Sequence, residues 1–290
     1  MSGEKGYSPK NILDVQDNYL FSFVKNIISF LKLFNMYSTW LNGILRSPET
    51  LQTLNFSENN YELEEKKYPV RNGILSLVYP KELGGDDAKF NAIYNFYAPL
   101  YDLNERVMGK LLVGVDMVKG REYIVSCLGL KPGMRILEVS PGPGVFQKFL
   151  RHEIGENGEL VALDLSIGML RQCQKRSKNL NVQLIHGNAQ YLPFANDSFD
   201  ALFHFGGVNL FNDPQKAIGE FVRVVKKDGI VSWGDEGFSP NYKNERRKKI
   251  MLKVNPGFSK PRPVIPDSIY DVKENEVYAG LAYLVVAKKK

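Results

Sequence analysis

The stretch Ile136-Leu137-Glu138-Val139-Ser140-Pro141-Gly142-Pro143-Gly144-Val145-Phe146 decides the fold of this 290-residue chain. Its first four residues predict a buried strand, and the glycines that follow predict a tight turn into a helix. Gly142 and Gly144 permit positive φ and let a ligand approach the backbone, and the start of the next helix offers unpaired N–H groups. Turns of this kind are common, so the residues further along the chain decide what this one binds.

Two nucleotide-binding motifs begin in the same way but do not fit these residues. A dinucleotide-binding fingerprint has a third glycine three positions after the second, where this chain has Gln147. A P-loop ends in Gly-Lys-Ser/Thr, and the stretch contains no such ending. Both interpretations are therefore disfavoured.

Apolar runs alternate with helical stretches from about Phe90 to the last residues. The runs have the length and composition of buried strands and cover residues 135–139, 160–164, 182–185, 199–204, 229–233 and 281–287. Helical stretches, for example residues 168–178 and 214–225, separate several of them. This alternation predicts an α/β domain with a parallel sheet.

Further motifs follow the glycine turn in a fixed order. Asp164 ends the second predicted strand, about 20 residues after the turn, where a carboxylate can accept hydrogen bonds from both hydroxyls of a ribose. Three segments come next: Gly-Asn-Ala-Gln-Tyr-Leu-Pro-Phe at 187–194, Asp-Ser-Phe-Asp at 197–200 and Glu-Phe-Val-Arg-Val-Val-Lys-Lys-Asp-Gly at 220–229.

In this order and spacing the motifs resemble the UbiE-like (ubiquinone/menaquinone biosynthesis) branch of the class I S-adenosylmethionine-dependent methyltransferases, from about Ala92 onward. The resemblance implies a Rossmann-like sheet, mostly parallel with an antiparallel last strand, and helices on both faces. It also implies an enzyme that uses S-adenosylmethionine to methylate a small, apolar or amphipathic acceptor, quinone-like or lipid-like.

The same resemblance implies a set of cofactor-binding residues. Glu138 and the two glycines correspond to positions that hold the methionine part, Asp164 to the ribose contact and Phe205 to a backbone contact with the methionine. The full set is Tyr101, Glu138, Gly142, Gly144, Asp164, Asn188, Ala189 and Phe205. Tyr101 belongs to an aromatic segment that resembles the lid over the cofactor.

Four residues depart from the family pattern: Ser140, Pro141, Pro143 and Asn188. Asn188, which with Ala189 corresponds to the adenine contact, replaces the more usual aspartate, and an uncharged acceptor should bind the adenine amino group more weakly. Pro143 between the glycines fixes φ and removes one N–H, so we expect a stiffer turn that still binds the cofactor.

Methyl transfer from a sulfonium mainly requires alignment of the reacting atoms and exclusion of water. A base helps if the acceptor is a phenol, an enol-like carbon or an amine. His204 and Glu236, near the carboxyl ends of predicted strands, are the candidate catalytic residues, although a buried strand histidine explains His204 equally well. Cys127 and Cys173 have no partners at metal-ligand spacing, so no metal site is predicted.

The sequence before residue 89 predicts two further structural elements. In residues 1–45 apolar side chains recur at helical spacing, which predicts amphipathic helices that pack on the catalytic domain or make a peripheral membrane contact. Residues 46–88 predict a small β element, and Tyr68-Pro69-Val70-Arg71-Asn72-Gly73-Ile74 resembles the end of a zinc-ribbon-like module. Because no cysteine precedes this run, the resemblance implies a ribbon without its metal. Residues 89–290 form the predicted methyltransferase domain.

The net charge of +6 includes basic runs at residues 246–249 and 288–290, which are typical of solvated faces. No motif interleaves basic and aromatic residues, so we expect a small-molecule acceptor and no nucleic-acid partner. The first residues lack a signal-peptide pattern, which predicts a cytoplasmic protein. Two alternatives stay open: a catalytically silent, methyltransferase-like scaffold, and an RNA-directed methyltransferase. The Asn/Asp-Pro-Pro-Tyr/Phe motif of nitrogen-methylating nucleic-acid enzymes is absent, which disfavours the second.

Overall fold

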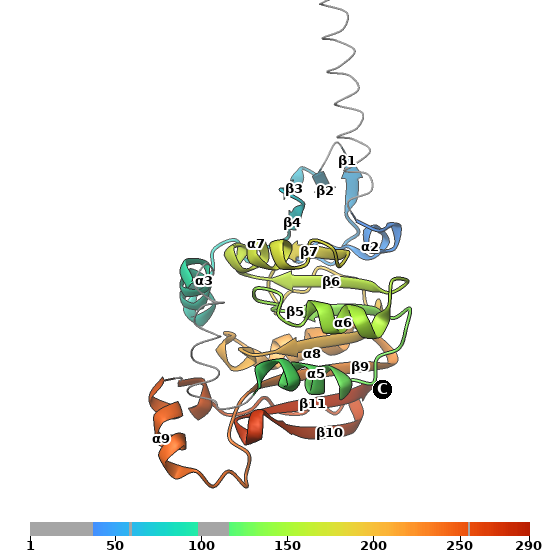
Figure 1. Ribbon diagram of the computed structural model, residues 1–290. Coiled ribbons are helices and arrows are strands. Elements are labelled where there is room, and N and C mark those ends of the chain that lie inside the picture. The colour runs from blue at the N-terminus through green and yellow to red at the C-terminus, as the bar shows by residue number, and fades with distance from the viewer. Residues whose placement is uncertain (1–36, 58–59, 98–115, 255) are drawn as a thin grey trace, which may run out of the picture.

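The computed structural model describes residues 37–57, 60–97, 116–254 and 256–290 (Figure 1). Its strands are β1 (Asn55–Ser57), β2 (Asn60–Leu63), β3 (Lys66–Arg71), β4 (Ile74–Ser76), β5 (Arg135–Val139), β6 (Glu159–Asp164), β7 (Val182–His186), β8 (Phe199–Phe205), β9 (Val225–Glu236), β10 (Ile269–Val277) and β11 (Ala282–Lys289). Its helices are α2 (Thr39–Ile44), α3 (Gly85–Tyr97), α5 (Met117–Ser126), α6 (Gln147–Ile154), α7 (Ile167–Arg176), α8 (Pro214–Val224) and α9 (Glu245–Val254). Short 3-10 turns are η3 (Val208–Leu210), η4 (Pro256–Ser259) and η5 (Tyr278–Gly280).

The described strands form one sheet with the order β1-β2-β3-β4-β7-β6-β5-β8-β9-β11-β10. From β4 to β9 neighbouring strands are parallel, whereas β11 lies antiparallel between β9 and β10. The predicted parallel sheet with an antiparallel last strand is therefore confirmed. Strand β10 was not predicted, because most of its residues are exposed and it lacks an apolar run.

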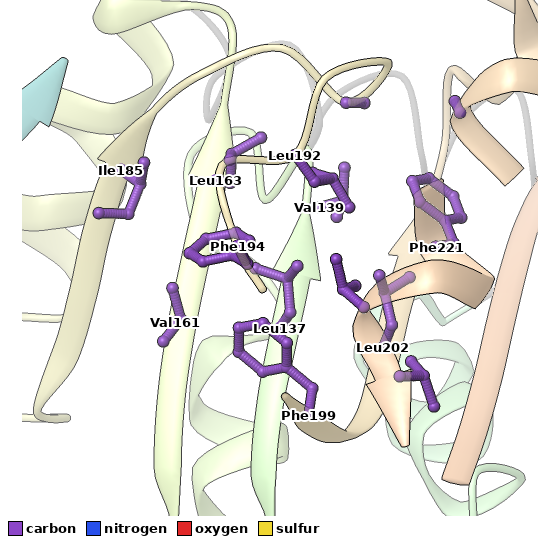
Figure 2. Close-up of a cluster of buried hydrophobic side chains, with 14 of the residues drawn as sticks. Leu137, Val139, Val161, Leu163, Ile185, Leu192, Phe194, Phe199, Leu202 and Phe221 are labelled. Carbon is purple, nitrogen blue, oxygen red and sulfur yellow. The ribbon is translucent and has the colours of Figure 1, made fainter. Parts of the chain in front are cut away.

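Helices cover both faces of the sheet, as predicted, and the parallel strands are therefore buried on both sides. Val161 and Leu163 of β6 belong to the cluster that also contains Phe221 of α8, shown in Figure 2. The alternate residues Leu160 and Ala162 belong to the clusters on the opposite face, with side chains of α5, α6 and α7. The carboxyl ends of the parallel strands thus meet at one edge, between two packed layers.

The N-terminal β element continues the central sheet. Strand β4 pairs in parallel with β7, with Leu75 opposite Ile185. The Tyr37 hydroxyl donates to the carbonyl of Leu184 at 2.8 Å and accepts from the N–H of Leu75 at 2.8 Å. The side chain of Tyr61 in β2 belongs to the same buried cluster as the central strands. Residues 37–57 and 60–78 therefore pack against the rest of the sheet through a shared core.

Several predictions for this region remain predictions. Most of the residues predicted to form amphipathic helices before α2 lie outside the described residues. The membrane contact predicted for these helices therefore stays a prediction. The ribbon-like character of residues 68–74 and the divisions at residues 45 and 88 also stay predictions, and α3 runs across the second of these. Among the described helices, none is long and apolar enough to cross a membrane.

The Glu-x-x-Arg motif of α8 has a structural role. Arg223 donates to the carbonyls of Leu192 and Phe194 at 2.8 and 2.7 Å, and its Nε donates to Glu220 at 2.6 Å. Glu220 in turn accepts from the N–H of Leu192 at 2.8 Å. The pair therefore fixes the Leu-Pro-Phe segment, whose Phe194 is fully buried beneath α8.

Replacing Arg223 by methionine should lower the free energy of unfolding by about 3 kcal/mol, because the mutation leaves Glu220 without its cation and removes the Arg223 donors from the carbonyls of Leu192 and Phe194. Urea unfolding measures the change. Arg171→Met, at an exposed position of α7, is the matched control and should stay within about 0.5 kcal/mol of the parent. Equal effects of the two substitutions would contradict the assigned role of Arg223.

Candidate active site

The glycine turn lies between the end of β5 and the start of α6. Ser140, Gly142 and Gly144 all have positive φ, at 55°, 55° and 82°. The Ser140 N–H donates to the Leu163 carbonyl at 2.7 Å, and the Gly142 N–H donates to Asp164 Oδ2 at 3.0 Å. A Cβ placed on Gly142 would meet no atom of the described residues within 4 Å. The backbone at Gly142 therefore faces open space that a ligand could fill.

Gly144 has a different reason to be glycine. A Cβ at this position would lie 2.9 Å from Cys173 Sγ and 3.2 Å from Cys173 Cα, in α7. Both distances are shorter than ordinary van der Waals contacts, so a side chain here would push α7 away from the turn. Gly144 thus permits close packing, whereas Gly142 leaves the turn open.

Two acids lie at the carboxyl ends of the adjacent strands β5 and β6. Burial raises the pKa of Asp164 to about 6. Burial, and secondly the charge of Asp164, raise the pKa of Glu138 to about 8. Gln147 of α6 donates its Nε2 hydrogen to Glu138, while its buried Oε1 has no hydrogen-bond partner among the described residues. Together the three side chains offer buried acceptors for the hydroxyl or amino groups of a ligand.

The raised pKa of Glu138 predicts a pH dependence of stability. An unfolded glutamate loses its proton near pH 4.5 and the folded one near pH 8, so the folded state binds more protons in between and stability falls as pH rises through this window. Urea unfolding of ligand-free protein at pH 5 and pH 8 should show a loss at least about 2 kcal/mol larger for the parent than for Glu138→Gln, because glutamine does not titrate. Parallel pH profiles for the two proteins would contradict the burial of an ionisable group here.

Helix α3 is fastened across this edge at two points. Asn95 Oδ1 accepts from the N–H of Gly168 at 2.7 Å and from Ser166 Oγ at 2.9 Å, at the start of α7. Near the other end of α3, Asp87 Oδ2 accepts from Asn188 Nδ2 at 3.3 Å and from Gln190 Nε2 at 2.7 Å, in the loop after β7. The helix therefore bridges the loops that follow β6 and β7.

This bridge explains the unusual asparagine at position 188. An aspartate there would place a second carboxylate beside Asp87, and like charges at such a distance repel each other. The amide instead donates to Asp87 and accepts the N–H of Gln190 at 3.0 Å. The carboxylate that the family pattern places after β7 is thus replaced here by an amide paired with an aspartate of α3.

The loop after β8 lies at the same carboxyl edge of the sheet, on the side of β5 away from β6 and β7. Phe205, which is partly exposed, packs against the rings of Phe146 and Tyr278 with centroid distances of 5.7 and 5.8 Å. Asp235, at the end of β9, accepts from the N–H groups of Gly207 and Asn209 at 2.9 and 2.8 Å. An aromatic wall and a fixed loop therefore stand beside the glycine turn.

The two candidate catalytic residues have very different surroundings. His204 is fully buried, donates from Nδ1 to the Val139 carbonyl at 3.0 Å and packs between the rings of Phe211 and Phe221. Burial lowers the pKa of the His204 ring, which favours its neutral form. This geometry matches the alternative of a buried strand histidine, because the side chain has no surface that an acceptor could touch.

Glu236 is partly exposed and follows Asp235 in β9. Burial raises the pKa of Glu236 well above its usual range, and the neighbouring Asp235 raises it further. The Asp235 carboxylate already accepts three N–H groups, those of Gly207, Asn209 and Glu236 itself. Glu236 is therefore the member of the pair that is available to exchange a proton at this edge.

Comparison with known proteins agrees with this geometry. Residues 137–232 match the model of a family described as "Methyltransferase domain". Residues 137–232 therefore form a methyltransferase domain. A chain from the solved complex between a methyltransferase activator and a putative methyltransferase of Haloferax volcanii has the same fold, with a TM-score of 0.50, 13% identity and coverage of 68% of this chain and 97% of that one.

Curated relatives of the methyltransferase domain carry names from quinone biosynthesis. A demethylmenaquinone methyltransferase from Renibacterium salmoninarum is 34% identical over 51% of this chain and 60% of its own length. A ubiquinone/menaquinone biosynthesis C-methyltransferase from Haemophilus ducreyi is 28% identical over 47% of this chain and 53% of its own length. A demethylmenaquinone methyltransferase from Desulfitobacterium hafniense is 29% identical over 65% of this chain and 78% of its own length. The chain thus matches little more than half the length of the first two.

The methyltransferase domain brings most of the predicted site residues to one edge of the sheet. Glu138, Gly142, Gly144, Asp164, Asn188, Ala189 and Phe205 all follow or end parallel strands there. Tyr101 lies outside the described residues. Asp87 and Asn95 of α3 and Tyr278 of η5 were not predicted as site residues. Asn95 lies in the same aromatic segment as Tyr101, but no motif marks Asp87 or Tyr278, and only the packing of distant segments brings the three residues to the edge.

Proposed function

We propose that the protein transfers a methyl group from S-adenosylmethionine to a small apolar or amphipathic acceptor, quinone-like or lipid-like. The observation that carries the proposal is the open backbone of Gly142, whose N–H donates to the Asp164 carboxylate at the carboxyl edge of a methyltransferase-type sheet. The names of the relatives from quinone biosynthesis support this kind of acceptor.

The residues at the glycine turn fit the proposed cofactor. S-adenosylmethionine, when bound, supplies an activated methyl group on a sulfonium. The Asp164 carboxylate is placed to accept hydrogen bonds from ribose hydroxyls. Glu138 and Gln147 Oε1, which has no hydrogen-bond partner in the described part of the chain, are buried acceptors for the amino group of the methionine part. Ala189, nearly buried after β7, offers its backbone to the adenine.

The part of the carboxyl edge near β8 and β9 has the properties of an acceptor site. The rings of Phe146, Phe205 and Tyr278 form an apolar wall that excludes water from the transfer. Glu236 beside Asp235 holds a proton more tightly than an ordinary carboxyl group. We assign to Glu236, once ionised, the removal of a proton from a hydroxyl group of the acceptor.

Replacing Glu236 by glutamine should lower kcat about thirtyfold with little change in KM, since a positioned base typically contributes a factor of this order or larger. The rate of the parent should rise with pH as Glu236 loses its proton, and that rise should disappear in the variant. His204→Gln is the matched comparison: we expect lower stability, because an amide replaces a buried ring, but the same pH dependence of the rate as in the parent. A pH profile lost in His204→Gln and kept in Glu236→Gln would reverse the assignment.

The proposal is tested by incubating the purified protein with S-adenosylmethionine labelled in its methyl group. We expect label to move to a reduced quinone that carries an isoprenoid tail, and not to single-stranded RNA. Label found on RNA alone would favour the RNA-directed alternative. Cofactor binding without transfer to any member of a panel of quinols and lipids would favour the scaffold alternative.

A further inference from the structure

The positive charge of the chain is concentrated in one segment. Residues 243–262 contain eight lysine and arginine residues and one glutamate, a net charge of +7, against +6 for the whole chain. The remaining residues together therefore carry a charge of −1. This segment includes helix α9 and lies between β9 and β10.

Helix α9 turns both cations and aliphatic side chains outward. Arg246, Lys249, Ile250 and Lys253 recur at helical spacing and are exposed, whereas Met251 is buried. Leu252 beside them is also exposed, and the exposed fractions of Ile250 and Leu252 are 41% and 38%. Among the described residues, Arg246, Lys249 and Lys253 take part in no ion pair. We call Arg246, Lys249, Ile250, Leu252 and Lys253 the α9 face.

The segment is anchored at the edge of the sheet that carries the candidate active site. Lys260 contacts Asp86 at the start of α3 at 2.9 Å. Phe238, two residues after Glu236, packs on Phe258 of η4 with a centroid distance of 4.7 Å. Figure 1 shows α9 standing off the sheet at the same end as α3. The α9 face therefore projects from the rim of the acceptor side.

We propose that the α9 face docks on a membrane surface that contains anionic phospholipids and brings the acceptor edge against the bilayer. The proposal rests on the proposed function for its purpose: a lipophilic acceptor would enter the site directly from the membrane. Lysine and arginine next to such a surface are attracted by anionic headgroups, and aliphatic side chains between them insert below the headgroups. An RNA partner would also attract the cations, but bases stack on aromatic rings and the α9 face exposes aliphatic ones.

The test is sedimentation of the full chain with vesicles, without cofactor or acceptor. We expect binding to vesicles of phosphatidylglycerol and phosphatidylcholine, little binding to phosphatidylcholine alone, and weaker binding as salt rises. The combined variant Arg246→Glu, Lys249→Glu, Lys253→Glu should lower the partition coefficient at least about tenfold.

A matched variant controls for total charge. Lys131, Lys227 and Lys288 are exposed and line a cavity of about 470 Å³ near the amino ends of the parallel strands, away from α9. Reversing these three charges changes the net charge by the same amount and should lower the partition coefficient less than about threefold, because the α9 face is left intact. A second variant, Ile250→Gln with Leu252→Gln, keeps every charge and should weaken binding to the anionic vesicles.

Equal losses in the two charge-reversal variants would overturn the proposal, as would vesicle binding that none of the α9 substitutions changes. A loss of binding to single-stranded RNA in the α9 variant, with vesicle binding unchanged, would assign the face to RNA instead. Vesicle binding is measured without cofactor, so a failure to bind vesicles would not affect the measured binding of S-adenosylmethionine. Likewise, a failure to bind S-adenosylmethionine would not affect the measured binding to vesicles.

Discussion

Replacing Asp164 by alanine should weaken the binding of S-adenosylmethionine about a hundredfold or more. A carboxylate that accepts two ribose hydroxyls makes two charge-assisted hydrogen bonds, and hydrogen bonds to a charged group contribute about 1.5–3 kcal/mol each. The same carboxylate also accepts the N–H groups of Gly142 and Ser166, at 3.0 and 2.8 Å, and so helps to shape the turn. Calorimetric titration of the purified variant measures the loss.

The matched substitutions separate charge from shape. Asp164→Asn keeps an acceptor oxygen and should lose less affinity than Asp164→Ala, whereas Asp267→Ala, at an exposed position before β10, should change nothing. Because burial raises the pKa of Asp164 to about 6, affinity in the parent should increase as pH rises from 5 to 7 and the carboxyl group ionises. Full affinity in Asp164→Ala would remove this residue from the cofactor site.

Replacing Gly144 by alanine should lower the free energy of unfolding by about 3 kcal/mol. The new Cβ would lie 2.9 Å from Cys173 Sγ, and an alanine at φ 82° is strained as well. At Gly142 we expect a small effect on stability and a large effect on cofactor binding. Gly142→Ala should lower the free energy of unfolding by only about 1 kcal/mol, because its Cβ would meet no atom in the part of the chain that the structure describes. It should lower cofactor affinity at least about tenfold, because the methyl group fills the space that the ligand needs.

A double variant tests the cause of the Gly144 effect. Adding Cys173→Ala to Gly144→Ala removes the sulfur at the short contact, while the contact of 3.2 Å with Cys173 Cα remains. We therefore expect partial recovery of stability in urea unfolding, measured relative to Cys173→Ala alone. Strictly additive losses in the double variant would show that the contact with α7 is not the cause.

The central sheet and the glycine turn could be predicted because their determinants are local. A buried parallel strand needs a continuous apolar run, and a turn with positive φ needs glycine or a residue that tolerates strain, so both leave a pattern in the sequence. The parallel pairing of β5 with β6, which brings Glu138 and Asp164 to the carboxyl ends of adjacent strands, follows from the usual order of such a sheet. The resemblance to a known family added the expected role of each position.

What could not be predicted depends on contacts between segments far apart in the chain. Nothing in the sequence around Asp87 shows that it will meet Asn188, about a hundred residues later, and so explain why this position holds an amide. The burial of His204 is another example, because the aromatic side chains that pack on it are Phe211, which follows η3, and Phe221 of α8. For a strand residue near the sheet edge, only packing decides between a core position and a site position.

The most direct test of the account is calorimetric titration of the freshly purified, ligand-free protein with S-adenosylmethionine and with its demethylated product, S-adenosylhomocysteine. We predict that each binds at one site per chain and that Asp164→Ala loses both. A folded parent protein that binds neither ligand would contradict the enzyme proposal and favour a methyltransferase-like scaffold.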